Sequence, residues 1–284
     1  MPELPEVETI RRGLLSLQKQ RIKDVVIHLP KIIRPADARK RLTGQRVETI
    51  DRRGKLLIFS LNSGDYLLIH LKMTGQLVYR PKSGELFVGG HPIINVLDVP
   101  NKFTHVELHF HDKGVLYFND VRRFGYLKLT DEAEVQKIKS SYGPEPLDLS
   151  LTTKQWLKIL EQKPQWSVKK LLLDQGQIAG IGNIYCDEAC FYTGIRPMRL
   201  AGSLKPIQKT ALLKNIRKVL NLSIKYGGTS FNSYVQSQGH QGKFYDLLKV
   251  YGRGGKRCQK CKKTSIMKIK FAGRGTHYCP TCQK

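Results

Sequence analysis

The sequence has few acidic residues, no long apolar run and no lipidation motif, and these absences narrow what it can do. Its 284 residues hold 23 Asp and Glu against 49 Lys and Arg, which gives a formal net charge of +26. Such an excess, spread over the whole chain, repels itself unless a polyanion is the partner. Because neither an apolar run nor a lipid attachment signal supports a membrane surface, nucleic acid is the favoured polyanion.

The N-terminus also lacks the apolar core of a secretory signal, and it carries acids within its first eight residues. Cysteines are scarce as well: of the six, four form a metal-binding pattern and two are left unpaired. We therefore expect an intracellular protein. The length is sufficient for two or three domains, each with its own core.

The N-terminal stretch after the initiator methionine offers a reactive group. If the methionine is removed, Pro2 begins the chain with a secondary amine whose ordinary pKa of about 7.7 to 8.0 leaves part of it unprotonated near neutral pH. Such an amine can form a Schiff base with an aldehyde-like carbon, and Glu3 beside it is a possible proton donor. The alternative is an ordinary helix start, with Pro5 at the first helical position and acids against the positive end of the helix dipole.

Apolar spacing in the first half predicts mainly strands. A helix is expected over residues 5–17, and strand follows strand from about 45 to 130. Hairpins are expected over residues 56–71 and 106–118. The stretch 81–102, rich in Gly, Pro and Asn, reads as a long loop. The first half is therefore predicted to be an antiparallel β-sandwich with a helix at its start.

The second half is predicted to be helical after a linker that contains Pro144 and Pro146. Thr152 or Thr153 can cap a helix through about Gln162, and further helices are expected from Val168 and over residues 205–225. Residues 227–243, rich in Gly, Ser, Gln and Asn, suggest a mobile loop.

A glycine-rich turn over residues 175–183 leads into a helix expected from Ile184. With Asn183 as cap, the free amides of that helix would form a site for an anionic phosphate. A tight turn between helices without a ligand is the alternative, and the charge balance leaves both readings open.

Two CxxC pairs near the C-terminus, 17 residues apart, can supply four thiolates to one tetrahedral zinc ion. We predict one structural Zn²⁺, whose clamp would hold a basic hairpin against nucleic acid. Cys186 and Cys190 are spaced by four residues on a helix, and they are expected to be buried core thiols. The four predicted zinc ligands are Cys258, Cys261, Cys279 and Cys282.

Taken together, these segments resemble the bacterial formamidopyrimidine-DNA glycosylases over nearly the whole chain. The order and spacing of the short motifs carry the resemblance, together with the cysteine tail. The matching motifs are PELPEVET (2–9), RRGK (52–55), HLKMTG (70–75), NDVRRFG (119–125), GPEPL (143–147), GIGNIY (180–185), GGT (227–229) and VYGR (250–253).

The resemblance implies an α+β multidomain fold: a catalytic β-sandwich domain with an N-terminal helix (1–132), a helix-two-turns-helix DNA-binding domain (133–246) and a zinc-finger β-hairpin (247–284). It implies a bifunctional glycosylase and AP lyase of base excision repair. Such an enzyme removes 8-oxoguanine and formamidopyrimidines from damaged double-stranded DNA through a Schiff base on the N-terminal proline, followed by β,δ-elimination. A cytoplasmic, nucleoid-associated monomer is expected.

The same resemblance assigns roles residue by residue. The catalytic set would be Pro2, Glu3, Lys55 and Arg274, with Arg274 also holding phosphate. Met73, Arg122 and Phe124 would fill the gap left by the flipped nucleotide and face its orphaned partner. The remaining DNA contacts would be Glu6, which lines the lesion pocket, and His70 and Asn183, which hold phosphates.

The sequence departs from the family pattern at three positions. Phe103 stands where a histidine is usual, Val121 replaces a proline before the paired arginines, and Lys243 replaces a tyrosine. We expect altered affinity or opposite-base preference before any loss of activity. The alternatives are an endonuclease VIII-type glycosylase for oxidised pyrimidines and a non-enzymatic zinc-ribbon protein that binds nucleic acid.

Overall fold

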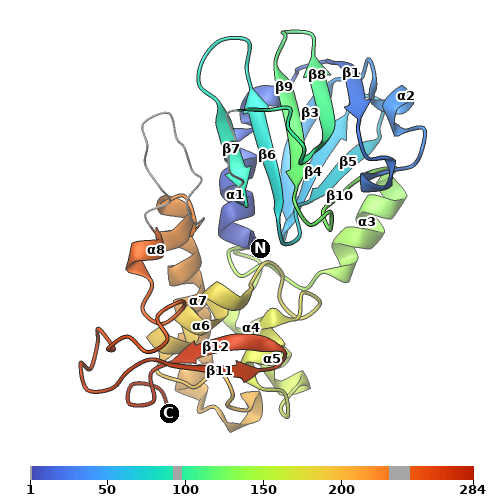
Figure 1. Cartoon of the computed structure of the whole chain (residues 1–284). Coiled ribbons are helices and arrows are strands. Elements are labelled where there is room, and N and C mark those ends of the chain that lie inside the picture. Colours follow the sequence, from blue (N-terminus) through green and yellow to red (C-terminus); the bar gives the residue numbers. More distant parts are fainter. Residues whose placement is uncertain (1, 92–97, 230–243) are drawn as a thin grey trace. The chain divides into compact units, whose positions relative to one another are not determined.

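The computed structural model describes residues 2–91, 98–229 and 244–284. The chain divides into two compact units (Figure 1). The first unit comprises Met1–Ser140 and Tyr226–Tyr245, and the second comprises Ser141–Lys225 and Asp246–Lys284. The second unit thus contains both the helices that follow the linker and the C-terminal hairpin. The boundaries of the three predicted domains remain a prediction.

The first unit contains two five-stranded sheets. One sheet is antiparallel throughout, in the order β1-β8-β9-β6-β7. Its strands are β1 (Ile22–Ile27), β6 (Gly75–Arg80), β7 (Phe87–Gly90), β8 (Thr104–Phe110) and β9 (Val115–Asp120).

The second sheet has the order β2-β10-β5-β4-β3, in which only the short β2 runs parallel to its neighbour. Its hairpin β4–β5 confirms the one expected over residues 56–71, and β8–β9 likewise confirms the other. The strands are β2 (Ile33–Arg34), β3 (Val47–Arg53), β4 (Leu56–Leu61), β5 (Tyr66–His70) and β10 (Tyr126–Thr130).

Strand β4 shows why the core takes this form. Successive side chains of a strand point to opposite faces, and β4 is apolar on both. Leu57 and Phe59 join the large core of the first unit, whereas Leu56 and Ile58 pack with Val135 of helix α3 (Glu132–Ser141). Helix α3 therefore covers the outer face of this sheet, and the sequence reading did not anticipate it.

Two predictions near the start of the chain need correction. The first α-helix, α1 (Leu4–Gly13), ends four residues earlier than expected, and a 3₁₀ turn, η1 (Leu15–Leu17), follows it. Strand β7 lies inside the stretch predicted to be a loop. At both places α1 and β7 pack closely: a Cβ on Gly13 would lie 1.9 Å from the Phe87 ring, and one on Gly89 would lie 2.4 Å from Ile10. Glycine here allows a helix and a strand to approach, which local periodicity does not reveal.

The second unit is built around α6 (Asn183–Thr193) and α7 (Pro206–Lys225), which pack on each other. The predicted capping of the first of its helices is confirmed: the Thr152 hydroxyl accepts from the Gln155 N–H at 3.2 Å. Cys186 and Cys190 are fully buried, as expected of core thiols. The other helices of the described chain are α2 (Ala38–Leu42), α4 (Thr153–Gln162), α5 (Val168–Leu173), α8 (Phe244–Leu247), η2 (Pro30–Ile32) and η3 (Ala201–Ser203).

The C-terminal hairpin belongs to the second unit and consists of β11 (Met267–Phe271) and β12 (Arg274–Tyr278). A buried carboxylate holds the chain that leads to it, because Glu188 of α6 accepts from the backbone N–H groups of Lys249, Val250 and Tyr251 at 2.8 to 3.0 Å. The fold class predicted from sequence is confirmed. Of the predicted mobile loop, residues 230–243 lie outside the described part of the chain.

Candidate functional site

The N-terminal site is fixed by the first turn of α1. Glu3 is the N-cap: its side chain accepts from the Glu6 N–H, while its own N–H donates to Glu6 Oε2 at 2.9 Å. This reciprocal capping box satisfies two backbone donors that a helix start would otherwise leave open. Both carboxylates are nearly buried, at 3% and 5% exposure. Pro2 directly precedes this cap, so its position is set by the helix; Pro5 is the second residue of α1 and not the first.

The second oxygen of Glu6 reaches a distant part of the same unit. The N–H and the hydroxyl of Thr229 both donate to Glu6 Oε1 at 2.9 Å. Gly228 makes this approach possible, because its φ is +90° and a Cβ there would lie 2.9 Å from Glu6 Oε1. The sequence contained the GGT motif but no signal that joins it to Glu6, 223 residues earlier.

Lys55 lies in the turn between β3 and β4, and it is 6% exposed. A chain of polar contacts ties that turn to α1. Arg52 donates to Glu8 Oε2 at 3.2 Å and to the Gly54 carbonyl at 3.1 Å. Burial alone would raise the pKa of Glu8, but hydrogen bonds from Arg11 and Arg12 and the charge of Arg52 lower it to about 2. Glu8 is therefore a permanent anion that fixes α1 against the strand leading to Lys55. Sequence reasoning missed this pair.

His70 ends β5, opposite Leu56, the residue after Lys55. Burial, together with the charges of Lys72 and Lys55, lowers the pKa of His70 to about 3. The Lys72 N–H donates to Nδ1 at 3.0 Å, which requires that nitrogen to be an acceptor. His70 is thus a neutral imidazole with its proton on Nε2. It can donate one hydrogen bond, and it does so as a dipole rather than as a cation.

The three residues predicted to fill the gap left by the flipped nucleotide, here called the wedge residues, lie on two neighbouring turns of the first unit. Met73 is half-buried between β5 and β6, while Arg122 and Phe124 lie in the exposed turn between β9 and β10. Phe124 is 52% exposed, and the Arg122 guanidinium lies 4.6 Å from the centre of its ring. An exposed ring with a stacked cation is suited to contact with a nucleobase.

The second unit brings Asn183 next to the hairpin residue that follows Arg274. Asn183 Nδ2 donates to the Gly275 carbonyl at 2.9 Å, and its second N–H can still donate elsewhere. Asn183 begins α6, and Gly182 is the N-cap, which corrects the expected cap. Without a side chain at Gly182, the chain enters the helix with its first amides uncovered.

A buried ionic network supports the same hairpin. Lys169 of α5 donates to Asp187 of α6 at 2.6 Å, and both side chains are fully buried. Asp187 also accepts from the His277 N–H at 2.8 Å, and Lys169 donates to the Gly275 carbonyl at 3.3 Å. A fully buried lysine needs such a partner. The only sequence signal was a lysine among apolar residues of α5.

The four predicted zinc ligands converge. Their Sγ atoms all lie within 4.8 Å of one another. A tetrahedral site with Zn–S bonds of about 2.3 Å requires sulfur atoms about 3.8 Å apart. Cys258 and Cys282 are 3.9 Å apart and Cys261 and Cys279 are 3.7 Å apart, so the donor set fits a zinc ion.

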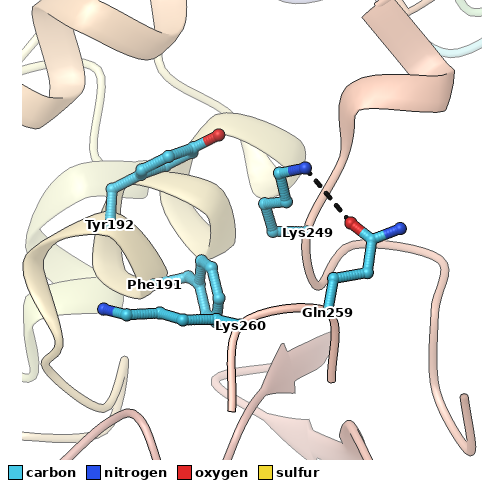
Figure 2. Close-up of a pocket in the computed structure, with 5 residues that line it drawn as sticks. All are labelled: Phe191, Tyr192, Lys249, Gln259 and Lys260. Carbon is cyan, nitrogen blue, oxygen red and sulfur yellow. Dashed lines mark hydrogen bonds between the residues drawn. The ribbon is translucent and has the colours of Figure 1, made fainter. Parts of the chain in front are cut away.

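A cavity of about 270 Å³ lies elsewhere in the second unit. Figure 2 shows Lys249 directed at the Gln259 amide, 3.1 Å away, with the rings of Phe191 and Tyr192 and the stem of Lys260 around the space. None of these lining residues belongs to the predicted site. Among residues 2–91, 98–229 and 244–284, no helix is both long and apolar enough to span a membrane.

Three family models match the chain. They are the formamidopyrimidine-DNA glycosylase N-terminal domain (residues 1–127), the helix-two-turns-helix domain of the same enzymes (142–235) and a zinc finger found in these glycosylases and in isoleucyl-tRNA synthetases (255–284). The fold and the site thus define a DNA-repair glycosylase with a C-terminal zinc finger.

Similar proteins identify the family within this class. The chain is 41% identical to the formamidopyrimidine-DNA glycosylase of Carboxydothermus hydrogenoformans over the full length of both chains, and 42% identical to that of Shouchella clausii over 100% of this chain and 99% of that protein. A solved structure of the Lactococcus lactis enzyme, bound non-covalently to DNA with an AP site, matches with a TM-score of 0.84 and 34% identity over 99% of each chain. The chain belongs to the formamidopyrimidine-DNA glycosylase family.

Proposed function

We propose that this protein is a bifunctional DNA glycosylase and AP lyase that removes oxidised purines, 8-oxoguanine and formamidopyrimidines, from damaged duplex DNA. The observation that carries the proposal is the capped start of α1. Pro2 directly precedes the buried N-cap Glu3, and Glu6 of the same capping box binds Thr229. The sequence PELPEVET alone does not require this geometry, and a solvent-exposed helix start would not give it.

The chemistry follows from the two residues at the cap. The lone pair of the Pro2 nitrogen attacks the sugar carbon that carries the damaged base, the glycosidic bond breaks, and the base leaves with its bonding electrons and a proton. Glu3 gives and takes protons at the sugar, and Lys55 assists as a proton donor and phosphate contact. The sugar ring then opens: the bond from that carbon to the ring oxygen breaks, the oxygen takes a proton, and the carbon is left as an iminium on Pro2. The iminium withdraws electrons, so the two carbon–oxygen bonds to the flanking phosphates break in turn by β- and δ-elimination.

The DNA contacts divide by unit. In the first unit, neutral His70 donates from Nε2 to a phosphate, Met73, Arg122 and Phe124 enter the base stack, and Glu6 with Thr229 borders the lesion pocket. In the second unit, Asn183 and Arg274 bind phosphate, since Asn183 is hydrogen-bonded to Gly275 and the exposed Arg274 directly precedes that residue in the hairpin.

We propose one structural Zn²⁺ held by Cys258, Cys261, Cys279 and Cys282. The metal would cross-link the two ends of the hairpin, and four thiolate ligands leave no open position for chemistry. We further propose that the protein acts as an intracellular monomer on double-stranded DNA. Metal analysis that gave other than one zinc per chain, or sedimentation of a dimer, would contradict these two statements.

Borohydride trapping tests the nucleophile. A duplex with 8-oxoguanine opposite cytosine is incubated with protein whose methionine has been removed and, in parallel, with protein that retains it. Borohydride reduces an imine to a stable amine, so only the trimmed protein should become linked to DNA. A Glu3→Gln variant keeps an oxygen that can cap α1 but cannot transfer a proton, and we expect its cleavage rate to fall about 100-fold or more.

The outcomes separate the alternatives. Equal trapping by both forms would mean that Pro2 is not the nucleophile. Binding without trapping by either form would favour a non-enzymatic zinc-ribbon protein. A higher kcat/KM for a duplex carrying an oxidised pyrimidine than for 8-oxoguanine would indicate the endonuclease VIII type.

A further inference from the structure

Asp120, the last residue of β9, is a fully buried carboxylate with no assigned role. It lies directly before the exposed turn that carries Arg122 and Phe124. The Arg122 N–H donates to Oδ1 at 3.1 Å, and the Gly125 N–H donates to Oδ2 at 2.7 Å. One side chain therefore holds both ends of this turn, and a buried anion is stabilised only where such donors converge on it.

The same carboxylate reaches the turn that carries Met73. The Thr74 hydroxyl donates to Asp120 Oδ1, and Thr74 Oγ1 also accepts from the Arg122 N–H at 3.1 Å. Asp120 pairs with Gly75 across the β6–β9 ladder, so this contact lies where the two strands end together. The turns of Met73 and Arg122 thus share one hydrogen-bonded centre.

Both turns contain backbone that would not persist without support. Lys72 and Arg123 have φ values of +48° and +58°, in the left-handed region that ordinary side chains disfavour. Gly125 cannot carry a side chain, because a Cβ there would lie 2.7 Å from the Phe118 ring and 3.1 Å from Asp120 Oδ2. Asp120 accepts from Arg122 and Gly125 on either side of Arg123, and from Thr74 in the turn of Lys72, so its hydrogen bonds restrain both turns.

We infer that Asp120 is a positioning residue that holds the Met73 turn and the Arg122–Phe124 turn as one preformed wedge. The inference rests on the proposed function, in which these side chains replace the flipped nucleotide. Asp120 would set how Met73, Arg122 and Phe124 are placed relative to one another. Because it holds Arg122, it would also affect which base is preferred opposite the lesion. Preformed turns bind without the entropy loss of ordering them, so loosening them weakens insertion.

The test compares Asp120→Asn with a matched control, Asp112→Asn. Asp112 accepts a turn N–H in the same way, from Gly114 at 2.8 Å, but it does so in the β8–β9 hairpin at the other end of β9. In Asp120→Asn one carboxylate oxygen is replaced by an N–H₂ group, which cannot accept. Either the Thr74 hydroxyl and the Arg122 N–H lose their acceptor, or the Gly125 N–H does, depending on how the amide is oriented. We expect kcat/KM for 8-oxoguanine opposite cytosine to fall at least 10-fold. The preference for cytosine over adenine as the opposite base should fall at least 5-fold, with both values unchanged in Asp112→Asn.

A second readout keeps the inference separate from the proposed function. 2-Aminopurine placed beside a stable abasic analogue brightens when its stack is opened, whether or not any chemistry follows. The brightening on binding should be halved or less in Asp120→Asn and in Thr74→Val, and restored in Thr74→Ser, which keeps the hydroxyl. Wild-type protein that brightens the probe but never traps would refute the proposed function alone. The positioning role would be overturned if Asp120→Asn and Thr74→Val folded and still gave the same brightening and the same base preference as the wild-type protein.

Discussion

His70 shows how one buried residue makes the stability of the protein depend on pH. Burial, with Lys72 and Lys55 nearby, lowers its pKa from 6.5 to about 3 in the folded state. Between pH 6.5 and about 3, His70 is therefore protonated in the unfolded chain but neutral in the folded one. The free energy of unfolding falls as the pH drops below 6.5. At 1.36 kcal/mol per pH unit, the native state should lose about 2 to 3 kcal/mol between pH 7.5 and 4.5 from this residue.

The prediction is that His70→Asn removes this part of the pH dependence. Asparagine places Oδ1 where Nδ1 accepts from Lys72, yet it does not titrate. Urea unfolding followed by circular dichroism measures the free energy of unfolding of both proteins. The difference between wild type and variant should shrink by about 2 kcal/mol from pH 7.5 to pH 4.5. His111→Gln is the control, because that side chain is exposed. An unchanged difference would mean that the fold does not lower the pKa of His70.

At the scale of elements, the pair Glu8–Arg52 joins α1, which begins beside Pro2, to the turn of Lys55. Both side chains are only 10% exposed, so the pair is shielded from water. Removing one partner of a shielded pair leaves the other poorly satisfied. Arg11 and Arg12 still bind Glu8, which limits the loss.

We predict that Arg52→Gln destabilises the protein by about 1 to 3 kcal/mol and lowers kcat more than it raises KM. The first effect reflects the lost pair, and the second follows because the Gly54 carbonyl loses its anchor beside Lys55. Urea unfolding and steady-state cleavage measure the two effects. The exposed pair Arg46–Glu48 supplies the control: Arg46→Gln should cost less than about 1 kcal/mol. Equal losses of stability and of kcat in Arg52→Gln and Arg46→Gln would contradict the proposed connection between Arg52 and the Lys55 turn.

Elements whose signals are local were predictable, and contacts between distant elements were not. The hairpin β4–β5 and the cap at Thr152 follow from turn residues and capping pairs within a few positions. By contrast, β7 depends on two glycines that let it approach α1, and the Glu6–Thr229 contact joins residues 223 positions apart. Motif order indicated the residues of the candidate site, but only the fold shows what holds them.

At the scale of the whole molecule, the charge of +26 sets how DNA binding responds to salt. Each phosphate that a cation neutralises releases counterions, so the logarithm of the binding constant falls with the logarithm of salt concentration by about 0.9 per contact. Arg274 is exposed next to the anchored Gly275, and in the proposed function it binds one phosphate. Arg39 is also exposed, but it is already paired with Asp24 at 3.2 Å.

We therefore predict that Arg274→Gln lowers the steepness of this salt dependence by about 1, whereas Arg39→Gln leaves it unchanged. Fluorescence anisotropy with a duplex containing a stable abasic analogue, from 50 to 300 mM salt, measures both. Protein that retains its initiator methionine should show the wild-type slope, because the positive charge is distributed over the chain, whereas in the proposed function the chemistry depends on the Pro2 amine alone. If Arg39→Gln flattened the slope as much as Arg274→Gln, the loss would reflect net charge alone, and Arg274 would have no phosphate of its own.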